Sequence, residues 1–270
     1  MYPILFKIPL FGLFGHDSFP VHSYGVLVAF GFIFGTLFIQ RAAKREGVDP
    51  VKALDLIFYI LIAAILGSRI LYVWTAEREQ FFQNPLILFK IWEGGLVFYG
   101  GFIASVLVGI WYVKKHQLSL WKVFDLFSPA VALGHAIGRL GCYFSGCCYG
   151  RPLLQETWYS IVFPPNPGSL APPGIPLSPT QLIDSGGEFV IFLALAWLLK
   201  HKKFDGQIFS LYLIGYAVLR FVNEMLRGDV ERGFVFQTEI STSQFIAMIL
   251  FAIGVALYIY KRAQRKGSTT

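Results

Sequence analysis

The sequence predicts an all-α integral membrane protein with seven transmembrane helices, folded as a single polytopic domain over residues 1–270. Composition is the first reason, since 55% of the 270 residues are hydrophobic and only 14% are charged. A soluble surface needs about a quarter charged residues, so this composition argues against a water-soluble enzyme. The other two reasons are seven apolar segments of membrane-spanning length and an uneven distribution of lysine and arginine.

Seven segments are long and apolar enough to cross a bilayer, which takes about 20 mostly apolar residues. Their remaining positions are mainly glycine, serine and threonine, which let helices pack closely in membranes. A buried helix of a soluble protein would imitate one such segment, but seven in one chain favour a membrane bundle. The predicted spans are Val21–Gln40, Asp55–Trp74, Leu96–Val113, Val123–Tyr143, Gln181–Leu199, Gly206–Leu226 and Ser241–Tyr260.

Basic residues give the predicted bundle an orientation. Of the 23 lysines and arginines, fourteen fall in the loops after the first, third and fifth spans and in the C-terminal tail. The excess of basic residues on cytoplasmic loops therefore places the N-terminus outside and the C-terminus in the cytoplasm. This explains the net charge of +7 and argues against a nucleic-acid partner. The fourteen are Arg41, Lys44, Arg45, Lys52, Lys114, Lys115, Lys122, Lys200, Lys202, Lys203, Lys261, Arg262, Arg265 and Lys266.

Two segments outside the spans fall on the outer side in this orientation. Residues 1–20 are apolar and aromatic, and they lack the basic region and small-residue cleavage site of a signal peptide. We expect them to form an outer arm on the membrane surface. Residues 144–180, approximately, form a long outer loop whose stretch PPNPGSLAPPGIPLSP excludes regular helix.

The sixth predicted span carries an unusual set of polar residues. A charge at mid-bilayer costs about 2.5–3.5 kcal/mol on insertion scales, so each charged residue there needs a reason. At about 100° per residue, Tyr216, Arg220, Glu224 and Arg227 share one face of a helix. One explanation is structural, with arginines that reach the interface and an internal Arg220–Glu224 ion pair. The other is a functional site.

Polar residues of four further spans fall at the same predicted depth. His135, Arg139 and Cys142 share one face of the fourth span. In the predicted orientation these residues, together with those of the sixth span, lie in the half of the bilayer nearer the outer surface. Tyr24, Arg69 and Tyr99, on the first, second and third spans, fall at this depth too. Five spans therefore predict a shared cavity in the outer half.

Arginine indicates what this cavity would bind. Guanidinium groups hold phosphate through two parallel hydrogen bonds and stay charged at any relevant pH. The phosphates at this depth are those of phospholipid headgroups. Arg139 and Arg220 in an apolar pocket therefore predict an anionic phospholipid as ligand, with Arg69 and Arg227 as further binding candidates. This pattern does not separate an enzyme from a protein that only binds lipid.

All three cysteines lie within seven residues, at Cys142, Cys147 and Cys148. With His135 they would suit a soft metal, but adjacent cysteines do not easily face one site, and we predict no metal. One cysteine as an enzyme nucleophile, or a disulfide that leaves one thiol over, are further interpretations. The simplest is close packing at a glycine-rich turn. The glycines fit a tight re-entrant loop that brings backbone N–H groups near a ligand; they are Gly138, Gly141, Gly146 and Gly150.

The run GRLGCYFSGCCYG at residues 138–150 resembles the signature of bacterial prolipoprotein diacylglyceryl transferases, G-R-x-[GA]-N-F-x-N-x-E-x-x-G. The resemblance extends over nearly the whole chain. HSYG, GSR, EGGLVFYGG, SPTQL and YAVLRFVNEMLR follow in the family's order. Seven spans with an outer N-terminus also match this family.

The chain departs from the family pattern in both segments. Cys142 and Ser145 stand where the signature has asparagine, and Cys147 stands where it has glutamate. Tyr99 replaces the family's histidine in the GG-x-x-[FY]-H-GG segment, so a histidine is not the base at that position. The spacing of the signature is kept, and the residues that still align with it are Gly138, Arg139, Gly141 and Gly150.

The resemblance implies a concrete reaction at the bacterial inner membrane. The sn-1,2-diacylglyceryl group of phosphatidylglycerol is transferred to the thiol of the lipobox cysteine in a preprolipoprotein, and glycerol phosphate is released. No metal or organic cofactor is implied. Arg139 and Arg220 would stabilise the departing phosphate. Glu224 would orient an arginine, and Tyr24 and Tyr99 would position headgroup hydroxyls or relay a proton.

Two other functions remain open at this point. A transporter or scramblase of anionic lipid would use the same arginines without chemistry, although no inverted repeat is evident. A family member with a different acceptor thiol would account for the cysteines in the signature. Lipid movement without thioether formation would favour the first, and glycerol phosphate release without modification of a lipobox peptide would favour the second.

Overall fold

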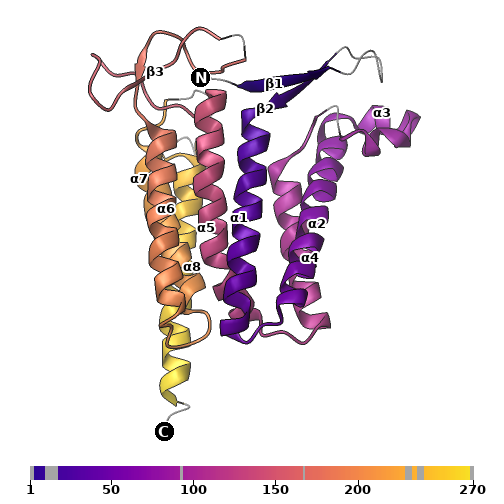
Figure 1. The fold of residues 1–270 in the computed structure, drawn as a ribbon, viewed down its shortest axis with the longest axis vertical. Helices are drawn as coiled ribbons and strands as arrows, with labels where there is room; N and C mark the ends of the chain where they lie inside the picture. The colour runs from indigo at the N-terminus through magenta and orange to yellow at the C-terminus, as the bar shows by residue number, and fades with distance from the viewer. Residues whose placement is uncertain are drawn as a thin grey trace. The chain divides into compact units, whose positions relative to one another are not determined.

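The structure, a computed structural model, describes residues 3–9, 18–91, 94–166, 168–228, 233–235 and 240–267. Parts of the expected outer arm (residues 1, 2 and 10–17) and the glutamate of the EGGLVFYGG segment lie outside the described residues. The long helices are α1 (Ser23–Glu46), α2 (Pro50–Ala76), α4 (Phe98–Lys115), α5 (Leu120–Ser145), α6 (Thr180–Leu199), α7 (Gln207–Glu224) and α8 (Thr242–Gly267) (Figure 1). A short helix α3 (Arg78–Gln83) and a 3₁₀ turn η2 (Pro85–Phe89) join α2 to α4.

Helices α1, α2, α6 and α8 are long and apolar enough to cross a membrane by length and composition. The other three predicted spans correspond to α4, α5 and α7, which have 18, 26 and 18 residues. Each of these three carries basic residues: α4 ends in two lysines, and α5 and α7 carry Arg139 and Arg220. The chain is therefore an all-α membrane protein.

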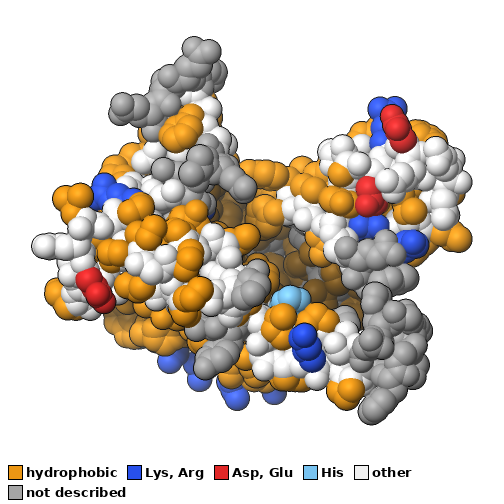
Figure 2. All heavy atoms as spheres, turned by 90° about the horizontal axis from the view of Figure 1, so that it is seen from above, with side chains coloured by type: hydrophobic (Ala, Val, Ile, Leu, Met, Phe, Trp, Pro, Cys, Tyr) orange, Lys and Arg blue, Asp and Glu red, His pale blue; other side chains and the backbone are white. Residues whose placement is uncertain are grey.

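The helices bury polar residues and expose apolar ones, as lipid-facing helices do. On α6 the exposed side chains include Phe189, Val190, Leu193 and Trp197. Its buried residues include Thr180, Gln181, Asp184, Ser185 and Glu188. Charged groups are costly in a bilayer and turn toward the protein interior, so this arrangement fits a surrounding bilayer. Figure 2 shows one face of the molecule, where charged side chains stand in a few small groups amid hydrophobic ones.

The chain divides into two compact units, Met1–Phe38 with Phe124–Thr270, and Ile39–Val123. In the first unit, α7 packs between α6 and α8, and Phe38 of α1 meets Phe192 of α6 edge to face, with ring centroids 5.5 Å apart. Asp125 of α5 is fully buried and accepts hydrogen bonds from the backbone N–H groups of Gly206 and Phe209 at the start of α7. This carboxylate satisfies N–H groups that have no partner within the helix, and so fixes where α7 begins.

Two small β-structures belong to the first unit. Strands β1 (Ile4–Pro9) and β2 (Ser18–His22) pair antiparallel, so the described part of the expected outer arm is a hairpin. In the expected long loop, β3 (Ile161–Val162) pairs with β4 (Pro176–Leu177) over a small core that includes Phe163. The described residues between α5 and α6 form no helix, as the prolines predicted.

In the second unit, α2 packs along α4, and Arg69 ties the intervening loop to α2. This guanidinium is buried and donates hydrogen bonds to the backbone carbonyls of Ile87 at 2.6 Å and Gly94 at 2.9 Å. It also pairs with Glu77 at 3.5 Å. Arg69 therefore holds the segment that leads into α4, near whose start Tyr99 lies exposed.

Candidate active site

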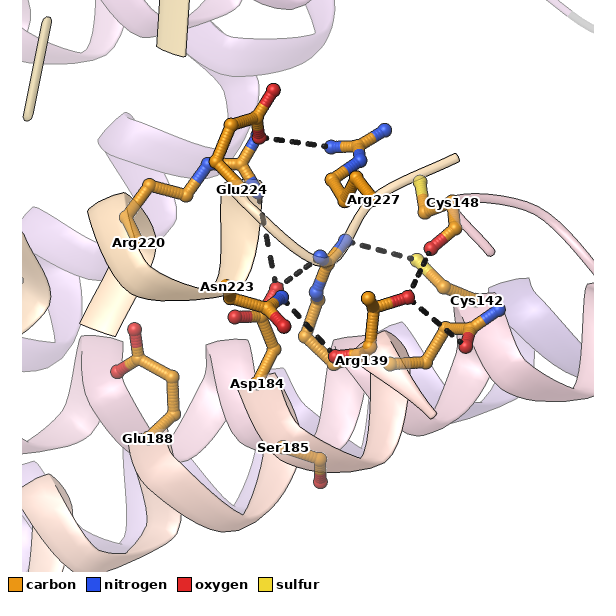
Figure 3. Close-up of polar contacts among 12 residues, drawn as sticks. Arg139, Cys142, Cys148, Asp184, Ser185, Glu188, Arg220, Asn223, Glu224 and Arg227 are labelled. Atoms are coloured by element: carbon orange, nitrogen blue, oxygen red, sulfur yellow. Dashed lines mark hydrogen bonds and ion pairs between the residues drawn. The ribbon is translucent and has the colours of Figure 1, made fainter. Parts of the chain in front are cut away.

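Three helices of the first unit bring a buried network of ionisable side chains together (Figure 3). Arg139 of α5 pairs with Asp184 of α6, and the same carboxylate lies 4.0 Å from Arg220 of α7. The C-terminal halves of α5 and α7 meet the first turns of α6 here, because α6 runs antiparallel to both. The structure thus joins the two arginines that the sequence predicted as phosphate ligands through one shared carboxylate.

A second carboxylate extends this network along α7. Glu224 Oε2 lies 2.8 Å from Arg220 Nη2 and 3.9 Å from Arg227 Nη1. The four-residue spacing places Arg220 and Glu224 on one face of α7, as the sequence predicted. For Arg227 the prediction of a shared helix face was wrong, because α7 ends at Glu224 and Arg227 pairs with Gly150 in an isolated β-bridge. From α8, Ser243 accepts a hydrogen bond of 2.8 Å from Arg220. Arg220 is therefore held by groups from three helices.

The groups of this network suit an anion. Arg139, Arg220 and Arg227 supply three guanidinium groups, and guanidinium groups hold phosphate oxygens through paired hydrogen bonds. Asp184 and Glu224, which pair with them, are nearly fully buried.

A second pair of polar side chains lies one turn away on the same helices. His135 Nδ1 of α5 is 2.9 Å from Glu188 Oε1 of α6. Glu188 is fully buried, and its other oxygen, Oε2, has no hydrogen-bond partner. The ring of Tyr216 on α7 lies 5.8 Å from the His135 ring, so this predicted binding residue also faces the pair. A histidine backed by a buried carboxylate can accept a proton and hold it.

Sequence reasoning missed Asp184 and Glu188. Both lie in the predicted fifth span, four residues apart, and therefore on one helix face. The rule that singled out Arg139 and Arg220, that an intramembrane charge marks a functional candidate, applies equally to these two acids. Two acids four residues apart in a predicted span were the sequence feature that would have identified them.

The cysteine-bearing loop follows α5 and is anchored to the start of α6. Gln181 donates to the carbonyl of Cys147 at 2.9 Å, and Thr180 donates to the carbonyl of Cys148 at 3.0 Å. Hydrogen bonds from the Cys142 and Cys147 thiols, with the nearby guanidinium groups, lower the pKa of the Cys148 thiol well below its usual value. Arg139 Nη1 is also 3.9 Å from Cys142 Sγ. The loop therefore borders the arginine network.

Two predicted glycines allow close approaches around this loop. Gly150 pairs with Arg227 in an isolated bridge, and a Cβ at Gly150 would collide with Ser178. At Gly141 a Cβ would lie 3.1 Å from the Tyr24 ring and 3.3 Å from its Cα, so the absence of a side chain lets α1 pack against α5. Gly138 has open space beside it.

The predicted site residues thus divide between the two units. Arg69 and Tyr99 belong to the unit Ile39–Val123. The other predicted site residues all belong to the first unit, and most of them lie in the C-terminal halves of α5 and α7 or in the segments that follow these helices. The predicted residues of the first unit are Tyr24, His135, Gly138, Arg139, Gly141, Cys142, Gly150, Tyr216, Arg220, Glu224 and Arg227.

Comparison with known proteins gives this network a context. The family model described as prolipoprotein diacylglyceryl transferase matches residues 12–260, which include every candidate residue above. The chain belongs to the prolipoprotein diacylglyceryl transferase family. The resemblance seen in the sequence is thereby confirmed.

Relatives within the prolipoprotein diacylglyceryl transferase family align along nearly their whole length. A phosphatidylglycerol–prolipoprotein diacylglyceryl transferase of Clostridium tetani is 34% identical over 98% of this chain and 100% of its own length. A second such transferase, of Clostridium perfringens, is 34% identical over 92% of this chain and 94% of its own. A third such transferase, of Finegoldia magna, is 36% identical over 93% of this chain and 95% of its own length.

Proposed function

We propose that this chain transfers the sn-1,2-diacylglyceryl group of phosphatidylglycerol to the lipobox cysteine of preprolipoproteins. The observation that carries the proposal is the buried network of Arg139, Asp184 and Arg220, in a chain of the prolipoprotein diacylglyceryl transferase family. The substrate sulfur attacks the terminal glycerol carbon that bears the phosphate, a C–S bond forms, and the C–O bond breaks. The products are a thioether-linked diacylglyceryl prolipoprotein and glycerol phosphate.

The arginines act on the leaving group. As the C–O bond breaks, a phosphodiester with one negative charge becomes a phosphomonoester with a second charge. Arg139 and Arg220 are the groups that stabilise this growing charge, and loss of one such preorganised donor costs on the order of 10²–10³ in rate. Asp184 and Glu224 orient them, because each carboxylate pairs with a guanidinium from a neighbouring helix or turn.

The thiol proton needs an acceptor. The pair of His135 and Glu188 provides one, since the imidazole is partly exposed and the carboxylate behind it is buried. Arginines near the sulfur also favour the thiolate. The nucleophile belongs to the substrate, so the chemistry requires no cysteine of the enzyme.

The remaining predicted residues fill supporting roles in this proposal. Tyr24 contacts the hydroxyl groups of the glycerol headgroup, and Tyr216 packs beside His135. Arg69 acts as a positioning residue through the loop that precedes Tyr99. The open space beside Gly138 admits lipid. Arg227, Cys142, Gly141 and Gly150 complete the binding loop.

The proposal extends to topology. We place seven spans in one polytopic domain of the bacterial inner membrane, with the N-terminus outside, because fourteen basic residues lie on the other side. The arginine network then lies near the outer leaflet, where a preprolipoprotein presents its lipobox cysteine. The apolar signal peptide of that substrate enters from the bilayer.

A direct assay tests the reaction. Protein purified in detergent is mixed with phosphatidylglycerol labelled in its glycerol headgroup and with a lipobox peptide. We expect stoichiometric release of labelled glycerol phosphate and a peptide mass increase of one diacylglyceryl unit. A peptide with serine in place of cysteine accepts nothing. Lipid binding or lipid movement without either product would overturn the proposal.

A matched pair of variants ties the reaction to the network. Arg139→Gln removes the predicted phosphate ligand, whereas Arg78→Gln removes an exposed arginine that stacks on Trp74. We expect the first to lose transfer by a factor of about 10²–10³ and the second to retain it. Equal activity of both variants would contradict the assigned role of Arg139.

A further inference from the structure

The three cysteines converge in space, although we expected from the sequence that the adjacent Cys147 and Cys148 would not easily face one site. The three sulfur atoms lie within 4.8 Å of one another, and all three cysteines are free of disulfides. These are the only cysteines of the 270-residue chain. The transfer reaction uses the thiol of the substrate, so it does not explain why these three thiols converge.

The backbone of the loop explains how adjacent cysteines point to one place. Gly146 and Cys148 both have left-handed conformations, with φ of 69° and 57°. This conformation is strained for a residue with a side chain and persists only where its surroundings hold it. Gln181 and Thr180 hold it here, because they bind the carbonyls of Cys147 and Cys148. The two turns fold Cys147 back, and its N–H donates to the carbonyl of Cys142 at 3.1 Å.

The geometry suits a single thiophilic ion. Zinc binds thiolates at about 2.3 Å, so sulfur atoms around one zinc ion lie about 3.8 Å apart in a tetrahedral arrangement. The observed limit of 4.8 Å exceeds this by about 1 Å, and rotation of the cysteine side chains closes that difference. Soft sulfur ligands select zinc, copper(I) and related ions over magnesium or calcium.

A bound cluster would have a counter-charge beside it. Three thiolates with a divalent ion carry one net negative charge, and Arg139 Nη1 lies 3.9 Å from Cys142 Sγ. Arg139 thus serves as a counter-charge to a metal–thiolate cluster as well as to phosphate.

We propose that Cys142, Cys147 and Cys148 bind one thiophilic divalent cation, of which zinc is the natural representative. The transfer chemistry itself needs no metal. The site neighbours Arg139, so a bound metal–thiolate cluster places a net negative charge beside that guanidinium. We therefore expect zinc to weaken phosphatidylglycerol binding.

Cadmium is the first probe, because its bonds to thiolate sulfur give an ultraviolet charge-transfer band. The full chain is reduced and purified in detergent with a histidine-free affinity tag, so that the tag binds no metal. We expect titration with Cd²⁺ to saturate at one ion per chain, and Zn²⁺ to displace it. Cys142→Ser, Cys147→Ser and Cys148→Ser should each lower Cd²⁺ affinity at least tenfold, whereas Ser145→Ala, at the end of α5, should not change it.

A second measurement needs no variant and so does not depend on how variants fold. N-ethylmaleimide should alkylate the half-buried Cys147 and Cys148 of the metal-free wild type, and one equivalent of Zn²⁺ should slow the alkylation of both together. Mass spectrometry counts the adducts. Absence of a charge-transfer band, binding of one ion per two chains, or protection of only one of these two thiols would overturn the proposal, and transfer activity would be unaffected by that failure.

Discussion

Arg139 of α5 and Asp184 of α6 form an ion pair in which the two side chains are only 10% and 3% exposed. In an apolar environment each partner offsets the cost of burying the other. The same carboxylate lies 4.0 Å from Arg220, so one acid fixes the direction of two guanidinium groups from different helices. A phosphate that binds both arginines therefore meets them already oriented, which is the condition for electrostatic stabilisation of a transition state.

Asp184→Asn is predicted to reduce transfer more than lipid binding. The amide keeps the size of the side chain but removes the charge that orients Arg139 and Arg220, so the donors lose their alignment toward the departing phosphate. We expect kcat to fall by about 10²-fold with a smaller change in KM. The rate of labelled glycerol phosphate release, measured over a range of phosphatidylglycerol concentrations, gives both kcat and KM. A larger change in KM than in kcat would assign Asp184 to ground-state binding instead.

The Arg139–Asp184 pair should also contribute to folding in a non-additive way. Removing one partner leaves an uncompensated buried charge, which costs about 3–5 kcal/mol. We therefore expect Asp184→Leu alone to lower the unfolding temperature in detergent, and the double variant Arg139→Met with Asp184→Leu to recover most of it. The double variant should remain inactive. Additive losses of stability would contradict a direct coupling of these two side chains.

Two substitutions of different severity, one on α7 and one on α8, test the role of Arg220. Arg220→Gln removes a phosphate ligand and should cost about 10²–10³ in rate. Ser243→Ala removes one hydrogen bond that Arg220 donates, at 2.8 Å, and leaves the ion pair with Glu224. A hydrogen bond to a charged group contributes about 1.5–3 kcal/mol, so its loss should cost at least about tenfold in rate if Ser243 aims Arg220. Unchanged activity of Ser243→Ala would show that Glu224 and Asp184 are enough to orient Arg220.

The sequence predicted the helices well because a bilayer imposes a simple rule of about 20 apolar residues. All seven predicted spans correspond to helices of at least 18 residues among the described residues. It also predicted the polar faces of α5 and α7, because residues at helical spacing share a face whatever surrounds them. The partners of those faces, Asp184 and Glu188, were not predicted, because which helices face each other depends on packing between distant segments. The convergence of Cys147 and Cys148 depends on two left-handed residues, which a sequence pattern does not encode.

Asp125→Ala should reduce stability without touching the chemistry. The carboxylate is fully buried and accepts hydrogen bonds from Gly206 and Phe209, at 2.8 and 3.0 Å, and pairs with Lys202 at 3.3 Å. Its removal leaves two N–H groups and an ammonium group without this partner, and breaking such a buried pair costs about 3–5 kcal/mol. We expect a lower unfolding temperature in detergent and near-normal transfer per folded molecule at low temperature. A large loss of kcat with normal stability would contradict this assignment.

His135→Gln should change how the rate depends on pH. The substrate thiol has an ordinary pKa of about 8.5, so below that pH its thiolate fraction falls about tenfold per pH unit. In the wild type, His135 backed by Glu188 takes the proton as sulfur attacks, so the rate should depend weakly on pH near neutrality.

Without the imidazole, only thiol that has already ionised reacts. The rate of His135→Gln should then rise nearly tenfold per pH unit between pH 6 and 8, because the thiolate fraction rises by that factor below a pKa of about 8.5. It should approach the wild-type rate above that range. The measurement is the initial rate of glycerol phosphate release over this pH range, with Glu188→Gln expected to show a weaker form of the same change. A uniform reduction at every pH would mean that His135 only binds or packs, and the proton would then have to leave by another group.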